Sequence, residues 1–90
     1  MNIVLKPRAL KNLEAIERYL ECEFGAKVKE KFLLRLREVL YLLSENPYLG
    51  KVYGNVRRYV VRKEISIIYE VEGNKIVILF FWDNRRKPLW

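Results

Sequence analysis

The chain has 90 residues, of which 51% are hydrophobic and 32% are charged, and this composition is typical of one small globular domain and not of a disordered segment. One cysteine and no histidine exclude an internal disulfide and argue against a structural metal site, and no motif requires a cofactor. No stretch is long and apolar enough to span a bilayer and no signal peptide is evident, so we expect a cytoplasmic protein in which residues 1–90 form a single domain.

The N-terminal half has the pattern of a short strand followed by two amphipathic helices. Asn2–Leu5 predicts an edge strand, and Pro7 suits the first position of a helix because its missing N–H is not needed there. The stripe of the first helix comprises Ala9, Leu13, Ile16, Leu20 and Phe24. Gly25 separates it from a second helix, whose stripe comprises Val28, Phe32, Leu36, Val39 or Leu40, and Leu43. So short a link predicts an antiparallel helical hairpin.

The C-terminal half changes to the period of strands. Residues 47–55 read as a loop, and residues 56–62 follow as a strand on which Arg58 and Arg62 share one face and Arg57 takes the other. Residues 65–72 alternate as a half-buried strand, and Gly73-Asn74 predicts a hairpin into an apolar, central last strand. We therefore expect an α+β fold of order β-α-α-β-β-β, with a curved, mainly antiparallel four-stranded sheet packed against the N-terminal helical hairpin.

Positive charge is concentrated in the strand half of the chain. Residues 46–90 carry nine cations and four anions, a net of +5, whereas residues 1–45 carry nine cations and seven anions, a net of +2. Arginines and lysines grouped beside aromatic rings bind phosphates or the carboxylates of an acidic partner. The candidate target- or phosphate-binding residues are Arg57, Arg58, Arg62, Arg85, Arg86, Lys87 and Trp90. The alternative is that the strand cations only solvate the open face of a sheet.

Each helix also carries a second, minor apolar stripe away from its main one. It includes Tyr19 and Cys22 on the first helix and Leu34 and Tyr41 on the second. These side chains are either ordinary exposed residues or a docking surface for another chain. The helical phase places Cys22 on the outer face, so we expect its thiol to be accessible in the folded protein.

The order and spacing of several motifs resemble the RelE/ParE superfamily of toxins from type II toxin–antitoxin modules, also called plasmid stabilisation proteins. The resemblance covers essentially the whole chain and rests on residues 5–9, 16–20, Phe24-Gly25, 46–51, Val56-Arg57, 67–71 and 85–88. It implies two mechanisms. RelE-like members cleave mRNA on the ribosome with Lys and Arg side chains, for which Lys51, Lys63, Arg85 and Arg86 are the candidates here. ParE-like members poison DNA gyrase and cleave no RNA.

One position favours the ParE-like branch. RelE-type nucleases place an arginine three residues before the strand tyrosine that corresponds to Tyr69, and this chain has Ser66 there. The sequence thus indicates a ParE-like, growth-inhibiting toxin, with a ribosome-dependent endoribonuclease as the alternative, and leaves open whether the protein is an enzyme. The resemblance also implies a cognate acidic antitoxin. The assembly it implies is either a homodimer or a toxin–antitoxin heterotetramer. We expect no membrane partner.

Overall fold

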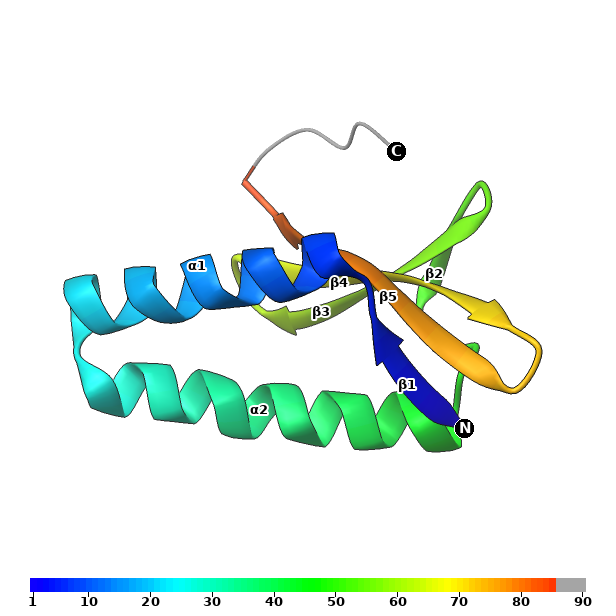
Figure 1. Ribbon diagram of the computed structural model, residues 1–90, viewed down its shortest axis with the longest axis horizontal. Helices are drawn as coiled ribbons and strands as arrows, with labels where there is room; N and C mark the ends of the chain where they lie inside the picture. The colour runs from blue at the N-terminus through cyan, green and yellow to red at the C-terminus, as the bar shows by residue number, and fades with distance from the viewer. Residues whose placement is uncertain (86–90) are drawn as a thin grey trace.

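The computed structural model of the chain describes residues 1–85, in which two helices pack against one sheet (Figure 1). The elements follow one another as β1 (Asn2–Leu5), α1 (Pro7–Phe24), α2 (Ala26–Glu45), β2 (Lys51–Tyr53), β3 (Val56–Arg62), β4 (Ile65–Glu72) and β5 (Lys75–Asp83). The predicted α+β fold with an N-terminal helical hairpin is confirmed. Neither helix is long and apolar enough to cross a membrane.

The sheet has five strands in the order β1-β5-β4-β3-β2. β1 runs parallel to β5, and the other neighbouring strands are antiparallel. The prediction of four strands is wrong by one, because β2 lies inside the segment expected to be a loop. Three residues are too few to show an alternating pattern, and β2 forms because the Gly54-Asn55 turn, with Gly54 at φ 59°, folds it back onto β3.

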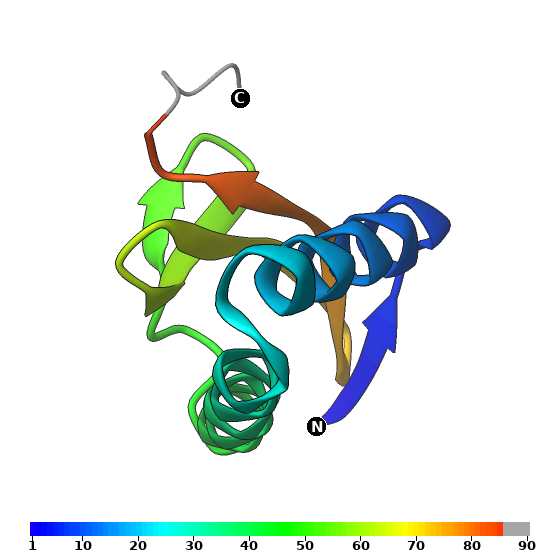
Figure 2. The ribbon, with the colours of Figure 1, turned by 90° about the vertical axis from the view of Figure 1, so that its left-hand side faces the viewer.

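The helical hairpin begins and turns where the sequence predicts. Pro7 is the first residue of α1, and Gly25, at φ 94°, separates α1 from α2 with a conformation that side chains disfavour. Figure 2, in which α2 is seen nearly end-on, shows α1 crossing in front of the sheet and α2 below it. The prediction that Phe24 belongs to the buried stripe is wrong: it is 57% exposed, and its ring lies edge-on to Tyr19 with centroids 6.1 Å apart.

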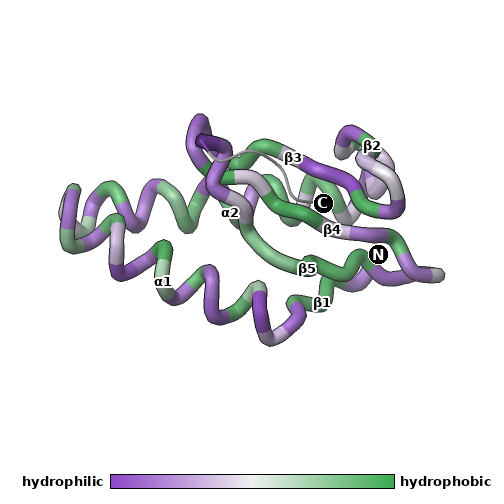
Figure 3. The backbone as a smooth tube through the Cα atoms, turned by 90° about the horizontal axis from the view of Figure 1, so that it is seen from above, coloured by the Kyte–Doolittle hydropathy of each residue, from purple (hydrophilic) through white to green (hydrophobic). Residues whose placement is uncertain are grey.

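The core lies between the helices and the side chains of the sheet that face them. Its buried members are Ala9, Leu20, Phe32, Leu36, Val39 and Leu43 from the helices and Val61, Ile65, Ile67, Tyr69, Ile76, Ile78 and Phe81 from the strands. Figure 3 shows hydrophobic residues along β1 and in the middle strands of the sheet. The expectation of a half-buried β4 is wrong for residues 65–69, which are buried on both faces because β4 is the middle strand and the Arg58 side chain lies against Ser66.

A buried tyrosine joins the core to the loop between α2 and β2. The Tyr69 hydroxyl donates to the Pro47 carbonyl at 2.8 Å and accepts from the Gly50 N–H at 2.9 Å. Gly50 is required at this approach, because a Cβ there would lie 2.6 Å from the Tyr69 oxygen. Burial raises the pKa of the Tyr69 phenol. The hydroxyl therefore stays protonated and holds the loop that leads into β2.

The Tyr69→Phe variant should lower the free energy of unfolding by about 1–3 kcal/mol, because it leaves the buried Gly50 N–H and Pro47 carbonyl without their partner. Chemical denaturation measures the change. Tyr41→Phe is the matched control, since Tyr41 is 70% exposed, and it should change stability by less than about 0.5 kcal/mol. Equal stability of the two variants would contradict the anchoring role of Tyr69.

Cys22 is exposed on α1, as its helical phase predicts. We expect the folded protein to react with a thiol reagent at roughly the rate of the chemically unfolded chain, because an accessible thiol has no folded structure to open first. Measuring both rates at one pH tests this. A folded-state rate slower by about tenfold or more would show that the thiol is covered in solution.

Candidate functional site

The face of the sheet turned away from the helices carries Lys51 and Arg58, neither of which pairs with a carboxylate of residues 1–85. Side chains directly opposite one another on neighbouring strands point to the same face. Lys51 on β2 lies opposite Arg58 on β3, and Arg58 lies opposite Ile68 on β4. The next residue on β3, Arg57, lies opposite the core residue Tyr69, so Arg58 and Lys51 must point away from the core. We call this side of the sheet the open face.

Arg58 is held in one orientation by two polar side chains. Its Nε donates to Ser66 Oγ at 3.1 Å, and its Nη2 donates to Asn84 Oδ1 at 3.1 Å. The Ser66 hydroxyl in turn donates to the same Asn84 oxygen at 2.5 Å. Asn84 is itself fixed to the β3–β4 turn, where its backbone N–H donates to the Glu64 carbonyl at 2.9 Å and its side chain donates to the Lys63 carbonyl at 3.2 Å. The guanidinium is thus positioned by neutral groups, and no carboxylate of residues 1–85 forms an ion pair with it.

Tyr53 completes a small cluster with Lys51 and Arg58 on the open face. The Lys51 Nζ lies 5.5 Å from the centroid of the Tyr53 ring. A hydrogen bond from Arg58, and to a smaller extent the charge of Lys51, lower the pKa of the Tyr53 phenol below its ordinary value. The cluster therefore contains an anchored guanidinium, an exposed ammonium and a phenol whose ionised form is stabilised. It can bind an anionic group.

The other predicted cations are placed apart from this cluster. Arg57 Nη1 donates to the carbonyls of Tyr48 at 3.0 Å and Gly50 at 2.8 Å, so it holds the α2–β2 loop. Arg62 pairs with Glu64 at 3.0 Å, and Arg85 pairs with Asp83 at 2.8 Å. Arg86, Lys87 and Trp90 lie outside the described residues, and Lys63 is exposed in the β3–β4 turn. Arg57, Arg62 and Arg85 therefore stabilise the fold or pair with a carboxylate, whereas Lys63 is exposed to solvent.

The expectation that Arg58 and Arg62 share a face does not hold. The register of β3 against β4 shifts between Val60 and Arg62, and Arg62 lies opposite the core residue Ile65. An extra residue in one strand interrupts the alternation on which such a prediction depends. Nothing in the sequence of β3 marks this shift, because the residues involved are valines and an arginine.

The four residues expected to meet an antitoxin are exposed. Leu34 and Tyr41 stand on α2 and are 56% and 70% exposed, whereas Tyr19 stands on α1 and is 49% exposed. Cys22 is exposed on α1 one turn beyond Tyr19. Among the four, Tyr19 lines a groove of about 530 Å³ between α1 and the end of β5, and the other three do not.

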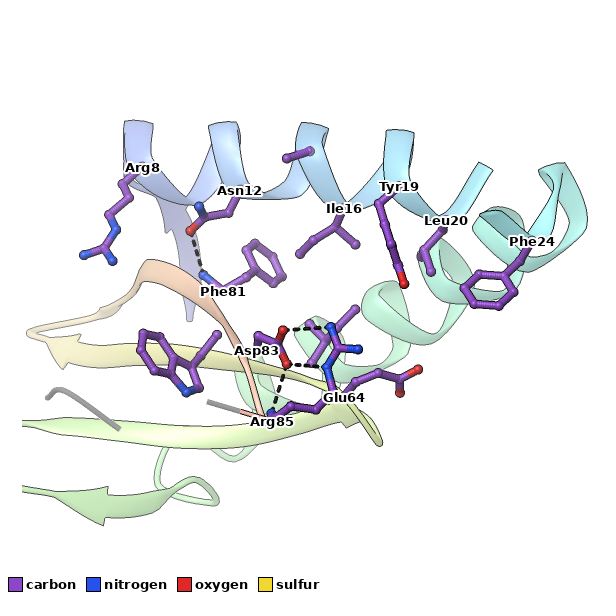
Figure 4. Close-up of a pocket in the computed structure, with 13 residues that line it drawn as sticks. Arg8, Asn12, Ile16, Tyr19, Leu20, Phe24, Glu64, Phe81, Asp83 and Arg85 are labelled. Atoms are coloured by element: carbon purple, nitrogen blue, oxygen red, sulfur yellow. Dashed lines mark hydrogen bonds and ion pairs between the residues drawn. The ribbon is translucent and has the colours of Figure 1, made fainter. Parts of the chain in front are cut away.

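Figure 4 shows this groove, with α1 above it and the end of β5 below. Its apolar wall is formed by Ile16, Tyr19 and Phe24. On the opposite side, Asp83 accepts two hydrogen bonds from the Arg85 side chain and one from the Arg85 backbone N–H. The groove is separate from the cluster on the open face.

Sequence reasoning missed the roles of Ser66, Asn84 and Tyr53. The sequence shows only that Ser66 stands where an arginine was expected. In the structure, the Ser66 hydroxyl accepts a hydrogen bond from Arg58 on the neighbouring strand. Asn84 directly follows the last strand. It lies beside the β3–β4 turn because the β4–β5 register pairs the preceding residue, Asp83, with Ile65. The one signal available was the Lys51-Val52-Tyr53 spacing, which puts Lys51 and Tyr53 on one face of a strand.

In a spectroscopic titration of tyrosine, we expect one phenol to ionise below the ordinary pKa of about 10 and to disappear in Tyr53→Phe. Arg58 and Lys51 stabilise the phenolate, so Arg58→Met should move that midpoint up toward the ordinary value. Tyr41→Phe should leave the early midpoint unchanged. Loss of the early midpoint in the Tyr41 variant, or none at all in the unmutated protein, would contradict the cluster.

Comparisons with known proteins agree with this fold. The structure resembles the chromosomal ParDE toxin–antitoxin system from P. aeruginosa, with a TM-score of 0.76 and 23% identity over 92% of this chain and 95% of that one. It also resembles the YoeB-YefM heterotetramer from Staphylococcus aureus (0.65 and 19%, over 91% and 94%) and a copper-bound mutant toxin from Helicobacter pylori (0.66 and 17%, over 94% and 96%).

The comparison with curated proteins gave no significant match. The family model for the ParE toxin of the type II toxin–antitoxin system parDE matches residues 3–88. That match spans nearly the whole chain, and the solved structures share its fold. The chain therefore belongs to the ParE toxin family of type II toxin–antitoxin systems.

Proposed function

We propose that this ParE-family toxin inhibits growth by binding a macromolecular target such as DNA gyrase through the Lys51–Tyr53–Arg58 cluster of the open face. The observation that carries the proposal is the hydrogen bond from Arg58 Nε to Ser66 Oγ. RelE-type nucleases resembling this chain have an arginine at the position of Ser66. Here a small hydroxyl occupies it and orients a cation from the neighbouring strand, an arrangement suited to binding an anionic surface.

The second part of the proposal is neutralisation by a cognate antitoxin. The net charge of +7 favours an acidic partner, and exposed apolar residues such as Tyr19 and Leu34 offer it contact area. The similar proteins include a ParDE toxin–antitoxin system and a YoeB-YefM heterotetramer. By this analogy we expect a partner encoded beside the toxin gene, a toxin–antitoxin complex as the resting assembly, and a target in the cytoplasm.

A second candidate function is ribosome-dependent cleavage of mRNA. The specific observation in its favour is the lowered pKa of Tyr53 beside Arg58 and Lys51. In such a reaction the phenol would exchange a proton while the two cations stabilise charge on the phosphate. The cluster has no histidine, so any acid–base chemistry would depend on Tyr53 or Lys51. This alternative uses the same residues as the first function. The two differ in outcome, because only the nuclease would produce cleaved mRNA.

Expression of the toxin with and without the product of the adjacent reading frame tests the function. We expect growth to stop with the toxin alone and to recover with both proteins. Purified toxin should then inhibit DNA supercoiling by gyrase in vitro and leave ribosome-bound mRNA uncut in primer extension. Cuts in the ribosomal A site would establish the nuclease instead, and normal growth under strong expression of soluble toxin would contradict both functions.

The Lys51→Met and Arg58→Met variants should each lose toxicity, because truncating a charged residue that pairs across an interface costs about 2–5 kcal/mol of binding free energy. Colony counts under graded induction measure the loss, and thermal unfolding checks that each variant folds. Arg62→Met is the matched control, since Glu64 already neutralises Arg62, and it should remain toxic. Full toxicity of Arg58→Met would place the active surface elsewhere.

A further inference from the structure

β2 forms the edge of the sheet beside the cluster on the open face. The strand order ends with β2, which pairs with β3, so its outer edge has no strand partner among residues 1–85. Figure 1 shows β2 and the turn after it projecting away from the helical hairpin. An exposed strand edge presents unpaired N–H and C=O groups, to which another extended chain can add.

The hairpin turn identifies which backbone groups face that edge. Gly54-Asn55 is a two-residue turn, and Tyr53 lies opposite Val56 at its base. The residues that flank such a turn exchange hydrogen bonds with each other. Hydrogen-bonded and non-hydrogen-bonded pairs alternate along antiparallel strands, so Val52 and Arg57 form a non-hydrogen-bonded pair. The N–H and C=O of Val52 therefore point outward, away from β3.

One side of β2 offers apolar contact to an added strand. Val52 is 55% exposed and lies opposite Arg57. The Arg57 guanidinium carbon lies 5.0 Å from the centroid of the Tyr48 ring, and Tyr48 is itself 63% exposed. Arg57 also donates to two loop carbonyls, so its hydrogen bonds are used within the fold. The side chain of an added strand that lies opposite Val52 would therefore meet an apolar surface.

The other side of β2 is cationic. Lys51 lies directly opposite Arg58, and neither pairs with a carboxylate of residues 1–85. Side chains that lie opposite one another on neighbouring strands have Cβ atoms about 4.5–5.5 Å apart. A strand added beyond β2 would place one of its own side chains at that distance from Lys51. A carboxylate there would be attracted by both cations, whereas another cation would be repelled.

The net charge of +7 decides between an acidic partner and a second copy of this chain. Two copies joined edge to edge would bring two strongly cationic domains together, and their mutual repulsion opposes such a dimer. An acidic segment has the opposite sign and is attracted to the same edge. The chemistry of β2 therefore favours an extended, acidic segment of another protein.

We propose that the target of this toxin contributes an extended, acidic segment that adds as a strand to the outer edge of β2, pairs its backbone with Val52 and places a carboxylate beside Lys51 and Arg58. This inference rests on the proposed function, because it describes how the target meets the cluster on the open face. In strand addition the backbone hydrogen bonds contribute affinity, and the flanking side chains give specificity.

The Val52→Pro variant tests strand addition without changing the charges of the cluster. Proline is tolerated on an edge strand where its missing N–H faces solvent, so β2 should stay paired with β3. The added strand would lose its donor, and we expect the toxin concentration that halves supercoiling by purified DNA gyrase to rise about tenfold or more. Val52→Ala keeps the N–H and should cause a smaller rise. An equal rise in the two variants would assign the effect to the side chain and overturn strand addition.

Ala26→Pro is the matched control for introducing a proline. Ala26 is exposed and is the first residue of α2, a position at which proline needs no N–H. This variant should inhibit gyrase as the unmutated protein does. Thermal unfolding checks that both proline variants fold.

Amide hydrogen exchange gives a second test that does not require Val52→Pro to fold. In the unmutated protein, exchange of the Val52 N–H should slow by about tenfold or more when gyrase is added, because the added strand supplies a carbonyl. Unchanged exchange in a toxin–gyrase complex would overturn strand addition.

Growth under graded induction separates the remaining outcomes. Loss of toxicity in Val52→Pro with full toxicity in Ala26→Pro supports the proposal whichever protein is the target. Full toxicity of Val52→Pro would overturn strand addition and leave the proposed function intact, whereas an unmutated protein without toxicity would overturn both. In sedimentation of the free toxin, a dimer that Val52→Pro dissociates would show that a second copy occupies the edge, and it would overturn the proposal.

Discussion

The alternation of side chains along β3 governs both the stability of the sheet edge and the chemistry of the open face. Arg57 and Arg58 are neighbours in sequence, and the strand sends them to opposite faces. Arg57 donates to two carbonyls of the loop before β2, the same loop that Tyr69 holds from the core. Arg58 points the other way and is held by Ser66 and Asn84. One guanidinium therefore supports the fold while the next is presented on the surface.

The positive charge of the protein is less available than its total indicates. Arg62 and Arg85 have carboxylate partners, and Arg57 is used by backbone carbonyls. Among residues 1–85, Lys51 and Arg58 are cations that the strand register places on the open face without a carboxylate partner. Arg58 is oriented by neutral groups, which fix a guanidinium in place without cancelling its charge. A surface of this kind is preorganised for an anionic partner, because little side-chain entropy remains to be lost on binding.

The open face and the groove beneath α1 are separate surfaces that meet at the end of β5. Asp83 lines the groove and holds Arg85, while the next residue, Asn84, holds Arg58 on the open face. Adjacent residues of one strand end therefore take part in both surfaces.

Local patterns predicted most of the secondary structure. The helical stripes, Pro7 and Gly25 defined the hairpin, and the apolar run of β5 indicated a central strand, because burial of periodic apolar residues is a local requirement on each element. The three-residue strand β2 escaped prediction, since it is shorter than any period that could reveal it. The exposure of Phe24 escaped as well, because a helical stripe does not show where the sheet beneath it ends.

The sequence by itself determined the fold class, the surplus of positive charge and the motif pattern of a toxin family. Only the tertiary structure decided which cations are free, because pairing depends on contacts between residues far apart in the chain. Asn84 reaches Arg58 across 26 positions and Asn12 reaches Phe81 across 69. A register shift of one residue in β3 also moved Arg62 away from Arg58. Such contacts follow from strand order and register, and no local pattern encodes them.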